Sequence, residues 1–217
     1  MILRPELESD LRAVEELTRD AFWNVHVPGC NEHYLLNVMR GVEAFIPALD
    51  TVAEENGRLV GNIVYTKAKI AGSDGTRVDV LSFGPVSVPP ADQGKGVGSA
   101  LIRHTLARAR ALGHGAVLIY GDPDYYGRFG FVPAEEYGIG TAQGMYATPL
   151  LALELVPSAL ADARGRFFED EVFDVDEDAA RAFDRGFPTR EKRENLPSQA
   201  RFRALVSMRR PMDTADA

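Results

Sequence analysis

Hydrophobic and polar residues alternate along this chain with two different periods, and each period predicts a different kind of element. Apolar residues recur at helical spacing over 11–22 and predict a helix there. Residues 51–55 and 59–70 have the character of strands, and the Asn56-Gly57 pair between them indicates a tight hairpin. The other predicted elements are a short strand at 2–5, a helix over 31–40, a strand over 78–88 and a helix over 99–112.

Beyond Pro157 the chain changes character. An acidic stretch is followed by a predicted short helix that ends at Gly186, and residues 202–206 have the pattern of a final strand. Four phenylalanines between positions 167 and 183 indicate that this segment packs against the core or against another subunit. We therefore expect a domain at 1–156 and a C-terminal extension at 157–217 that packs on it, with no chemistry of its own and with disorder from Asp213 onward.

The run from Val86 to Ser99 joins the predicted strand to the predicted helix through a glycine-rich turn. Gly94, Gly96 and Gly98 lack the Cβ atoms that would keep a ligand away from the backbone, so successive N–H groups can converge on an anion. The N-terminus of the following helix adds unpaired N–H groups and the positive end of its dipole. Lys95 adds a mobile cation. The turn predicts a pyrophosphate site.

Two common phosphate-binding motifs do not fit this turn. The dinucleotide fingerprint requires glycine where the chain has Ser99, and the P-loop requires Gly-Lys followed by Ser or Thr after a four-residue gap. The spacing Gln93-x-x-Gly96-x-Gly98 instead resembles the coenzyme A pyrophosphate loop of the GNAT superfamily of N-acetyltransferases. A second match, from Gly121 to Phe131, is similar to the YhbS-like branch of that family, which carries an extra C-terminal segment. The resemblance covers 1–156 well and the remainder loosely.

The resemblance implies an α/β (α+β) GNAT-type fold, with a mixed, mostly antiparallel central sheet, a splayed cofactor-binding strand and flanking helices, plus a C-terminal appendage. Pro85 cannot donate to a sheet ladder, so its strand is either bulged or at an edge, and the resemblance implies the bulge. The freed backbone groups could then pair with the pantetheine arm of coenzyme A. The implied cofactor-binding residues are Val86, Val88, Gln93, Gly94, Lys95, Gly96, Val97, Gly98 and Ser99.

The resemblance also implies that an amine attacks the thioester of acetyl-CoA directly, in a ternary complex. The backbone N–H of Val88 is the counterpart of the group that stabilises charge on the thioester carbonyl. Tyr126 occupies the position of the general acid that protonates the leaving thiolate, with Tyr125 as its competitor. Ser82 stands where histone-acetylating relatives have a glutamate as general base, so this role is not carried over.

The general base therefore stays open. An alkylammonium acceptor is almost wholly protonated at neutral pH, and something must take its proton. Ordered water could do so without any side chain. Carboxylates or histidines that could lie near the site, each of which also has an ordinary structural interpretation, are Asp79, Asp122, Glu154, His26 and His33.

Composition restricts the function only moderately. The chain has 217 residues and a formal net charge of −8, which argues against sequence-independent nucleic-acid binding and against binding to an anionic membrane surface. Cys30 is the only cysteine, so no intramolecular disulfide is possible and a cytoplasmic location is the natural expectation. Apolar runs are too short to span a membrane, and the N-terminus does not resemble a signal peptide. We expect no metal site.

These observations together predict a cytoplasmic acyl-CoA-dependent N-acyltransferase that transfers acetyl from acetyl-CoA to a primary amine. The alternative is a catalytically silent acyl-CoA-binding sensor or regulatory module, against which Tyr126 argues. A homodimer is compatible with the resemblance. The acceptor stays open among polyamines, aminoglycosides, peptide N-termini and protein lysines.

Overall fold

The computed structural model describes residues 1–212 and divides into two compact units. Strands β3 (Arg58–Ala71) and β4 (Arg77–Ser87) contribute residues to both units. The expected disorder from Asp213 onward lies outside the described residues. Unit 1 comprises Met1–Tyr65, Gly84–Thr105 and Glu171–Phe202, and unit 2 comprises Thr66–Phe83, Leu106–Asp170 and the residues from Arg203 onward.

Nine strands form a mixed, mostly antiparallel sheet, which confirms the predicted fold class. Besides β3 and β4, the strands are β1 Ile2–Pro5, β2 Thr51–Glu55, β5 Ala116–Tyr120, β6 Val132–Pro133, β7 Ile139–Thr141, β9 Leu150–Glu154 and β10 Gly165–Phe168. Hydrogen bonds connect them in the order β1-β2-β3-β4-β5-β9-β6, and β10 pairs with β3 and β7. The β4–β5 and β10–β7 pairings are parallel. A second, two-stranded sheet pairs β8 (Met145–Ala147) with β11 (Arg209–Pro211).

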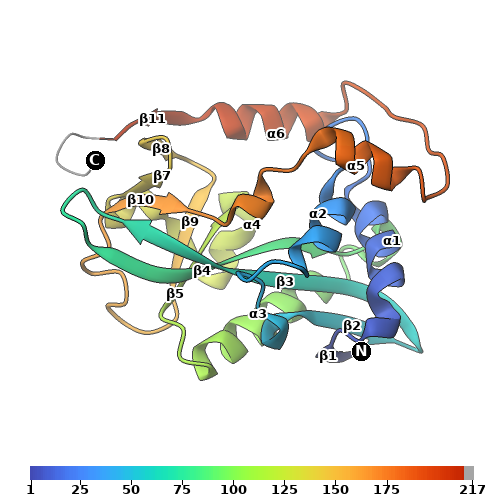
Figure 1. The fold of residues 1–217 in the computed structure, drawn as a ribbon, viewed down its shortest axis with the longest axis horizontal. Coiled ribbons are helices and arrows are strands. Elements are labelled where there is room, and N and C mark those ends of the chain that lie inside the picture. The colour runs from blue at the N-terminus through green and yellow to red at the C-terminus, as the bar shows by residue number, and fades with distance from the viewer. Residues whose placement is uncertain (213–217) are drawn as a thin grey trace. The chain divides into compact units, whose positions relative to one another are not determined.

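Unit 1 contains the predicted hairpin and a group of neighbouring helices. Asn56 and Gly57 have φ values of 52° and 74°, and two left-handed residues in a two-residue turn match the twist of the flanking strands. The helices α1 (Leu11–Phe22), α2 (Glu32–Met39) and α5 (Glu177–Asp184) lie together in Figure 1. A hydrophobic core shared by α1, α2, β2 and β3 consists of Val14, Leu35, Leu36, Met39, Val52 and Val64, and Phe173, which precedes α5, packs against it. The C-terminal segment therefore completes the hydrophobic core of the N-terminal helices.

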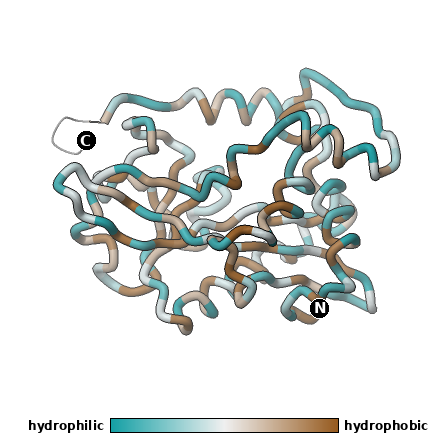
Figure 2. Tube along the Cα trace, in the orientation of Figure 1, coloured by the Kyte–Doolittle hydropathy of each residue, from teal (hydrophilic) through white to brown (hydrophobic). Residues whose placement is uncertain are grey.

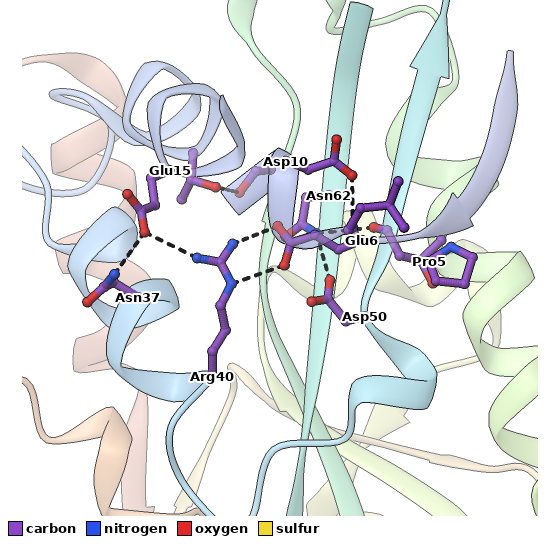
Figure 3. A network of polar contacts seen from close by, with 12 residues as sticks. Pro5, Glu6, Asp10, Glu15, Asn37, Arg40, Asp50 and Asn62 are labelled. Carbon is purple, nitrogen blue, oxygen red and sulfur yellow. Dashed lines mark hydrogen bonds and ion pairs between the residues drawn. The ribbon is translucent and has the colours of Figure 1, made fainter. Parts of the chain in front are cut away.

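A buried polar network connects the first strand of unit 1 to its helices (Figure 3). The Arg40 guanidinium donates to the two carboxylate oxygens of Glu6 at 2.6 and 3.0 Å, and to Oε1 of Glu15 at 3.2 Å. Asn62 Nδ2 donates to Asp50 Oδ1 at 3.0 Å. Burial and the neighbouring Glu6 carboxyl raise the pKa of Asp50 to about 8. Asp50 therefore carries a proton at neutral pH, which avoids placing a second negative charge beside Glu6.

In unit 2, β4 and β5 separate shortly after they meet. Within the described residues, their register has a single pair, Leu81 opposite Val117, and both strands continue beyond it without pairing with each other. This confirms the splayed strand. Pro85 lies beyond this pair, where β4 is not paired with β5, so its missing N–H costs no hydrogen bond between these two strands. On its other side, β5 pairs with β9 in antiparallel orientation along its whole length.

The predicted final strand at 202–206 is wrong, because these residues belong to helix α6 (Pro197–Ser207). Pro197 stands at the first helical position, where its missing N–H costs nothing. Gln199 accepts the N–H of Leu196 at 3.3 Å, and Ala, Arg and Leu residues that follow favour a helix over a strand. The segment between α5 and α6 is hydrophilic along most of its length (Figure 2), as the polar composition of residues 192–198 predicts.

Candidate active site

The glycine-rich turn forms the N-terminus of α3 (Val97–Ala111), which begins two residues earlier than the sequence predicts. Gly94 and Gly96 have φ values of 75° and 85°, a backbone conformation that glycine adopts without strain. The carbonyl of Gly96 accepts the N–H of Ala100 at 2.9 Å, so it starts the helical hydrogen bonding. The N–H groups of the first turn, which have no partner within the helix, therefore belong to residues 97–99. An anion fits this position.

Asp92 directly precedes this turn and is not among the site residues predicted from the sequence. Its carboxylate is 2 % exposed and accepts two hydrogen bonds from Arg58, at 2.7 and 3.0 Å, and one from Lys95 Nζ at 3.1 Å. The hydrogen bond from Arg58 is the main reason that the pKa of Asp92 falls to about 2. Lys95, expected as a mobile cation, is thus paired with a carboxylate of its own loop. In the sequence, this ion pair is indicated by the three-residue spacing of Asp92 and Lys95.

Two further contacts position the turn within unit 1. Gln93 Nε2 donates to the carbonyl of Val88 at 2.9 Å, which joins the end of the splayed strand to the start of the loop. A Cβ atom on Gly61 would lie 2.9 Å from side-chain atoms of both Leu101 and Val97. Because only glycine fits there, α3 packs directly on the backbone of β3. Val86 and Val88 are both partly exposed, as a ligand-pairing strand end requires.

Tyr126 ends the short helix α4 (Pro123–Tyr126) in unit 2, and Asp122 caps that helix by accepting the N–H of Asp124 at 3.0 Å. The Tyr126 ring lies 5.9 Å from the Phe83 ring and 5.8 Å from the Phe131 ring. Burial raises its pKa, so the phenol stays protonated and is available as a donor.

The neighbouring Tyr125 is placed differently. Its ring packs edge to face against the Tyr126 ring, with 5.0 Å between the centroids. The Arg128 guanidinium lies 4.7 Å from the centroid of the Tyr125 ring. Gly121, at the end of β5, explains why Tyr126 sits where it does: a Cβ atom there would overlap the Tyr126 ring, 2.3 Å from its nearest atom. The Tyr126 ring thus packs on Phe83 of β4 and at the end of β5, and its choice over Tyr125 as the general acid stays a prediction.

Ser82, the position at which the expected general base was missing, is fully buried in β4. Its hydroxyl donates to Glu169 Oε1 at 2.8 Å. Glu169 follows β10 and comes from the C-terminal extension, 87 residues further along the chain. Burial raises its pKa above the ordinary value, and the Ser82 hydrogen bond opposes that shift only in part. Glu169 lies in the acidic stretch after Pro157, and no local pattern in the sequence predicts this contact.

The other candidate bases have structural partners. His33 is buried in unit 1, where its Nε2 lies 3.1 Å from Asp184 Oδ1 and its Nδ1 lies 3.6 Å from Cys30 Sγ. Burial lowers the pKa of His33 and raises that of Cys30, so this Cys-His-Asp arrangement is an inert packing site. Of the others, Asp79 pairs with Arg77, Asp122 caps α4, Glu154 accepts the N–H of Leu160, and His26 lies beside Glu32.

The loop and the tyrosine thus form two well-defined parts, one in each compact unit. Residues 86–99 belong to unit 1, and Tyr126 with Ser82 and Glu169 belongs to unit 2. Among residues 1–212, no group of three or more His, Cys, Asp or Glu side chains could hold a metal ion. Over the same residues, no helix is both long and apolar enough to cross a membrane.

Comparison with known families identifies the class of protein. The Acetyltransferase (GNAT) domain family matches residues 3–134, which is more than half of the chain. The chain therefore belongs to the GNAT family of N-acetyltransferases, which confirms the family resemblance found in the sequence.

Two curated relatives and two solved structures agree with this assignment. The N-acetyltransferase YjhQ of Escherichia coli (strain K12) is 38 % identical over 92 residues, which are 42 % of this chain and 50 % of YjhQ. YhbS of the same organism is 24 % identical over 139 residues, 64 % of this chain and 78 % of YhbS. The match thus spans half the length of YjhQ and most of YhbS.

The solved structures show the same fold. The crystal structure of E. coli YhbS in complex with CoA superposes with a TM-score of 0.70 at 23 % identity, and the match covers 80 % of this chain and 92 % of that one. A GNAT family acetyltransferase from Brucella melitensis in complex with acetyl-CoA has a TM-score of 0.63 at 29 % identity, covering 79 % of this chain and 97 % of that one. One of these complexes contains CoA and the other acetyl-CoA, the acyl donor that the family resemblance implies.

Proposed function

We propose that this protein transfers an acetyl group from acetyl-CoA to a primary amine by direct attack in a ternary complex. The observation that carries the proposal is the turn at residues 93–99, which presents the free N–H groups of a helix N-terminus next to two left-handed glycines. The complexes of similar proteins with CoA and acetyl-CoA support it.

Each residue of the proposed site has a distinct role. The first turn of α3 and the loop N–H groups bind the pyrophosphate, with Lys95 close by. The ends of the splayed strand, Val86 and Val88, pair with the amide groups of the pantetheine arm, and the Val88 N–H stabilises negative charge on the thioester carbonyl. Tyr126, kept neutral by burial, donates its proton to the sulfur as the thiolate leaves.

Calorimetric titration of acetyl-CoA into the purified protein tests the cofactor, with NAD and ATP as controls. We expect micromolar binding of acetyl-CoA alone. In Gly96→Glu, a carboxylate in the loop repels the pyrophosphate and binding is lost. Gly75→Glu is the matched control, because Gly75 has nearly the same φ of 87° and equally open surroundings, but lies in the β3–β4 turn. Equal loss in both variants would show backbone strain rather than a phosphate site.

Turnover tests the enzyme assignment. Amines are screened for release of free thiol from acetyl-CoA, and Tyr126→Phe is compared with Tyr125→Phe. We expect Tyr126→Phe to bind acetyl-CoA normally and to lose about 10²-fold or more in kcat, whereas Tyr125→Phe changes little. Normal turnover in Tyr126→Phe would remove Tyr126 as the acid. Tight cofactor binding with no turnover on any amine would favour the silent acyl-CoA-binding module.

A further inference from the structure

A primary alkylamine needs a proton acceptor before it can attack a thioester, because at neutral pH nearly all of it is ammonium. The residues that the sequence analysis considered for this task are engaged elsewhere, as caps or ion pairs. Glu169 is a carboxylate of unit 2 that is partly buried and accepts a hydrogen bond from a neutral hydroxyl, that of Ser82 at 2.8 Å.

Its position follows from the separation of β4 and β5. The two strands pair at Leu81 and Val117 and then part, so Ser82 and the residues after it border the opening between them. Glu169 is held at Ser82, the first residue of β4 beyond the pair. It also acts on Tyr120, the last residue of β5, whose pKa is raised by burial and by the Glu169 charge. The Ser82 hydrogen bond therefore holds Glu169 on the β4 side of the opening.

Tyr126 is anchored at the same opening by the next residue on each strand. Its ring contacts Phe83, which follows Ser82, and packs on Gly121, which follows Tyr120. Consecutive strand residues point to opposite faces of a sheet, so Ser82 and Phe83 direct Glu169 and Tyr126 to the two sides of β4. A thioester placed in the opening would have a carboxylate on one side and a phenol on the other, which is what separate proton transfers at nitrogen and sulfur require.

The charges around Glu169 favour its role as an acceptor. Ser82 from β4 donates to it, and Tyr120 from β5 is a neutral phenol whose ionisation Glu169 opposes. On β3, which pairs with β10, Lys69 Nζ lies 5.8 Å above the ring of Phe168. Within the described residues, no cation lies within ion-pair distance of Glu169, in contrast to Asp92, which accepts from Arg58 and Lys95. A carboxylate held in this way has a raised affinity for a proton.

We infer that Glu169, supplied by the C-terminal extension, is the general base that accepts the proton of the incoming amine. This inference rests on the proposed function. The proton balance is as follows: the ammonium gives its first proton to Glu169, which releases it to solvent, and the neutral nitrogen forms a bond to the thioester carbon. When the C–S bond breaks, Tyr126 protonates the sulfur and regains a proton from the nitrogen, so that an amide and a thiol remain.

Glu169→Gln tests the inference, since Gln keeps the shape and can still accept from Ser82. The reaction is followed as thiol release with an alkylamine that the wild type acetylates. We expect kcat/KM to fall about 10²-fold or more, with acetyl-CoA affinity unchanged. Glu171→Gln, an exposed glutamate two residues further on, is the matched control and should behave as wild type.

The pKa of the acceptor provides a readout that a structural role would not move. With a trifluoroethyl-type analogue of the same acceptor, whose amine is largely neutral at neutral pH, we expect Glu169→Gln to lose only a few-fold in kcat/KM. The wild type should lose activity at low pH as Glu169 is protonated, and Glu169→Asp should retain that dependence with reduced rate. Equal losses with both amines, or no loss with either, would overturn the role of Glu169. Absence of wild-type turnover on every amine would instead refute the proposed function.

Discussion

Two carboxylates of this protein, one buried and one partly buried, have opposite surroundings. Asp92, in unit 1, accepts hydrogen bonds from Arg58 and Lys95, and its pKa falls to about 2. Glu169, in unit 2, accepts one from the neutral Ser82 hydroxyl, and its pKa rises. A carboxylate between two cations stays ionised and holds a loop in place, whereas one that burial destabilises can take up a proton. The hydrogen-bond partners of each carboxylate, rather than its residue type, therefore decide whether it serves as a structural anchor or is suited to act as a base.

The largest expected effect is on the pH dependence of stability, and it concerns a third carboxylate, Asp50, whose pKa is raised like that of Glu169. Its folded-state pKa of about 8 lies above its ordinary value, so its contribution to stability is complete below about pH 4 and is lost as pH rises toward about 8. Relative to Asp50→Asn, which keeps the bond from Asn62, the free energy of unfolding of the wild type should fall by up to about 1.4 kcal/mol per pH unit in that window. Urea unfolding at several pH values measures it.

The control for Asp50→Asn is Asp79→Asn, since Asp79 is an exposed carboxylate in a surface ion pair. Its stability difference from the wild type should stay nearly constant over the same pH range. A flat difference for Asp50→Asn as well would mean that Asp50 is ionised in the folded protein and that Glu6 does not oppose its charge.

The next effect tests Asp92 as an anchor. Asp92→Asn leaves Arg58 and Lys95 without their shared counter-charge, and we expect the Tm near neutral pH to fall by about 5 °C. Because the folded pKa lies below the ordinary value, the contribution of Asp92 is present above about pH 4 and is lost as pH falls toward about 2. The gap in Tm between wild type and Asp92→Asn should therefore narrow in acid. A gap that widens in acid would contradict the pairing.

For Glu169 the sign is reversed, and the effect is smaller. Its folded pKa is raised, so the stability of the wild type relative to Glu169→Gln should be greatest in acid and should decline as pH rises above the ordinary glutamate value. Thermal melts of both proteins over the same pH series measure the decline. If Glu169→Gln lost stability with rising pH relative to wild type, Glu169 would be a second anchor like Asp92.

The smallest effect belongs to Ser82→Ala. Removing the hydroxyl takes away the hydrogen bond that partly opposes the rise in the pKa of Glu169. We expect the acid limb of the kcat/KM profile to move to higher pH by less than about one unit, with the rate above it nearly unchanged. A shift to lower pH, or a loss of rate comparable to that of Glu169→Gln, would show that Ser82 does more than hold the carboxylate.

Much of the fold and part of the site could be predicted because the signals are local. The Asn56-Gly57 turn, the glycines of the loop and the spacing from Tyr126 to Phe131 each lie within a dozen residues, so the sequence displays the whole arrangement. The helix at 197–207 shows where local signals fail: residues 202–206 form a short, mostly apolar run like that of a strand, but Pro197 and the helix-forming residues after it favour a helix. Short apolar runs do not distinguish the two states.

The sequence by itself determined the family and predicted the cofactor loop and Tyr126, because these depend on residues that are neighbours in the chain. Only the tertiary structure decided the electrostatic partners. Arg58 reaches Asp92 across 34 residues, Glu169 reaches Ser82 across 87, and Asp184 reaches Arg19 across 165. Whether a carboxylate is ionised depends on the charges and the solvent around it, and those are fixed only when distant segments fold together.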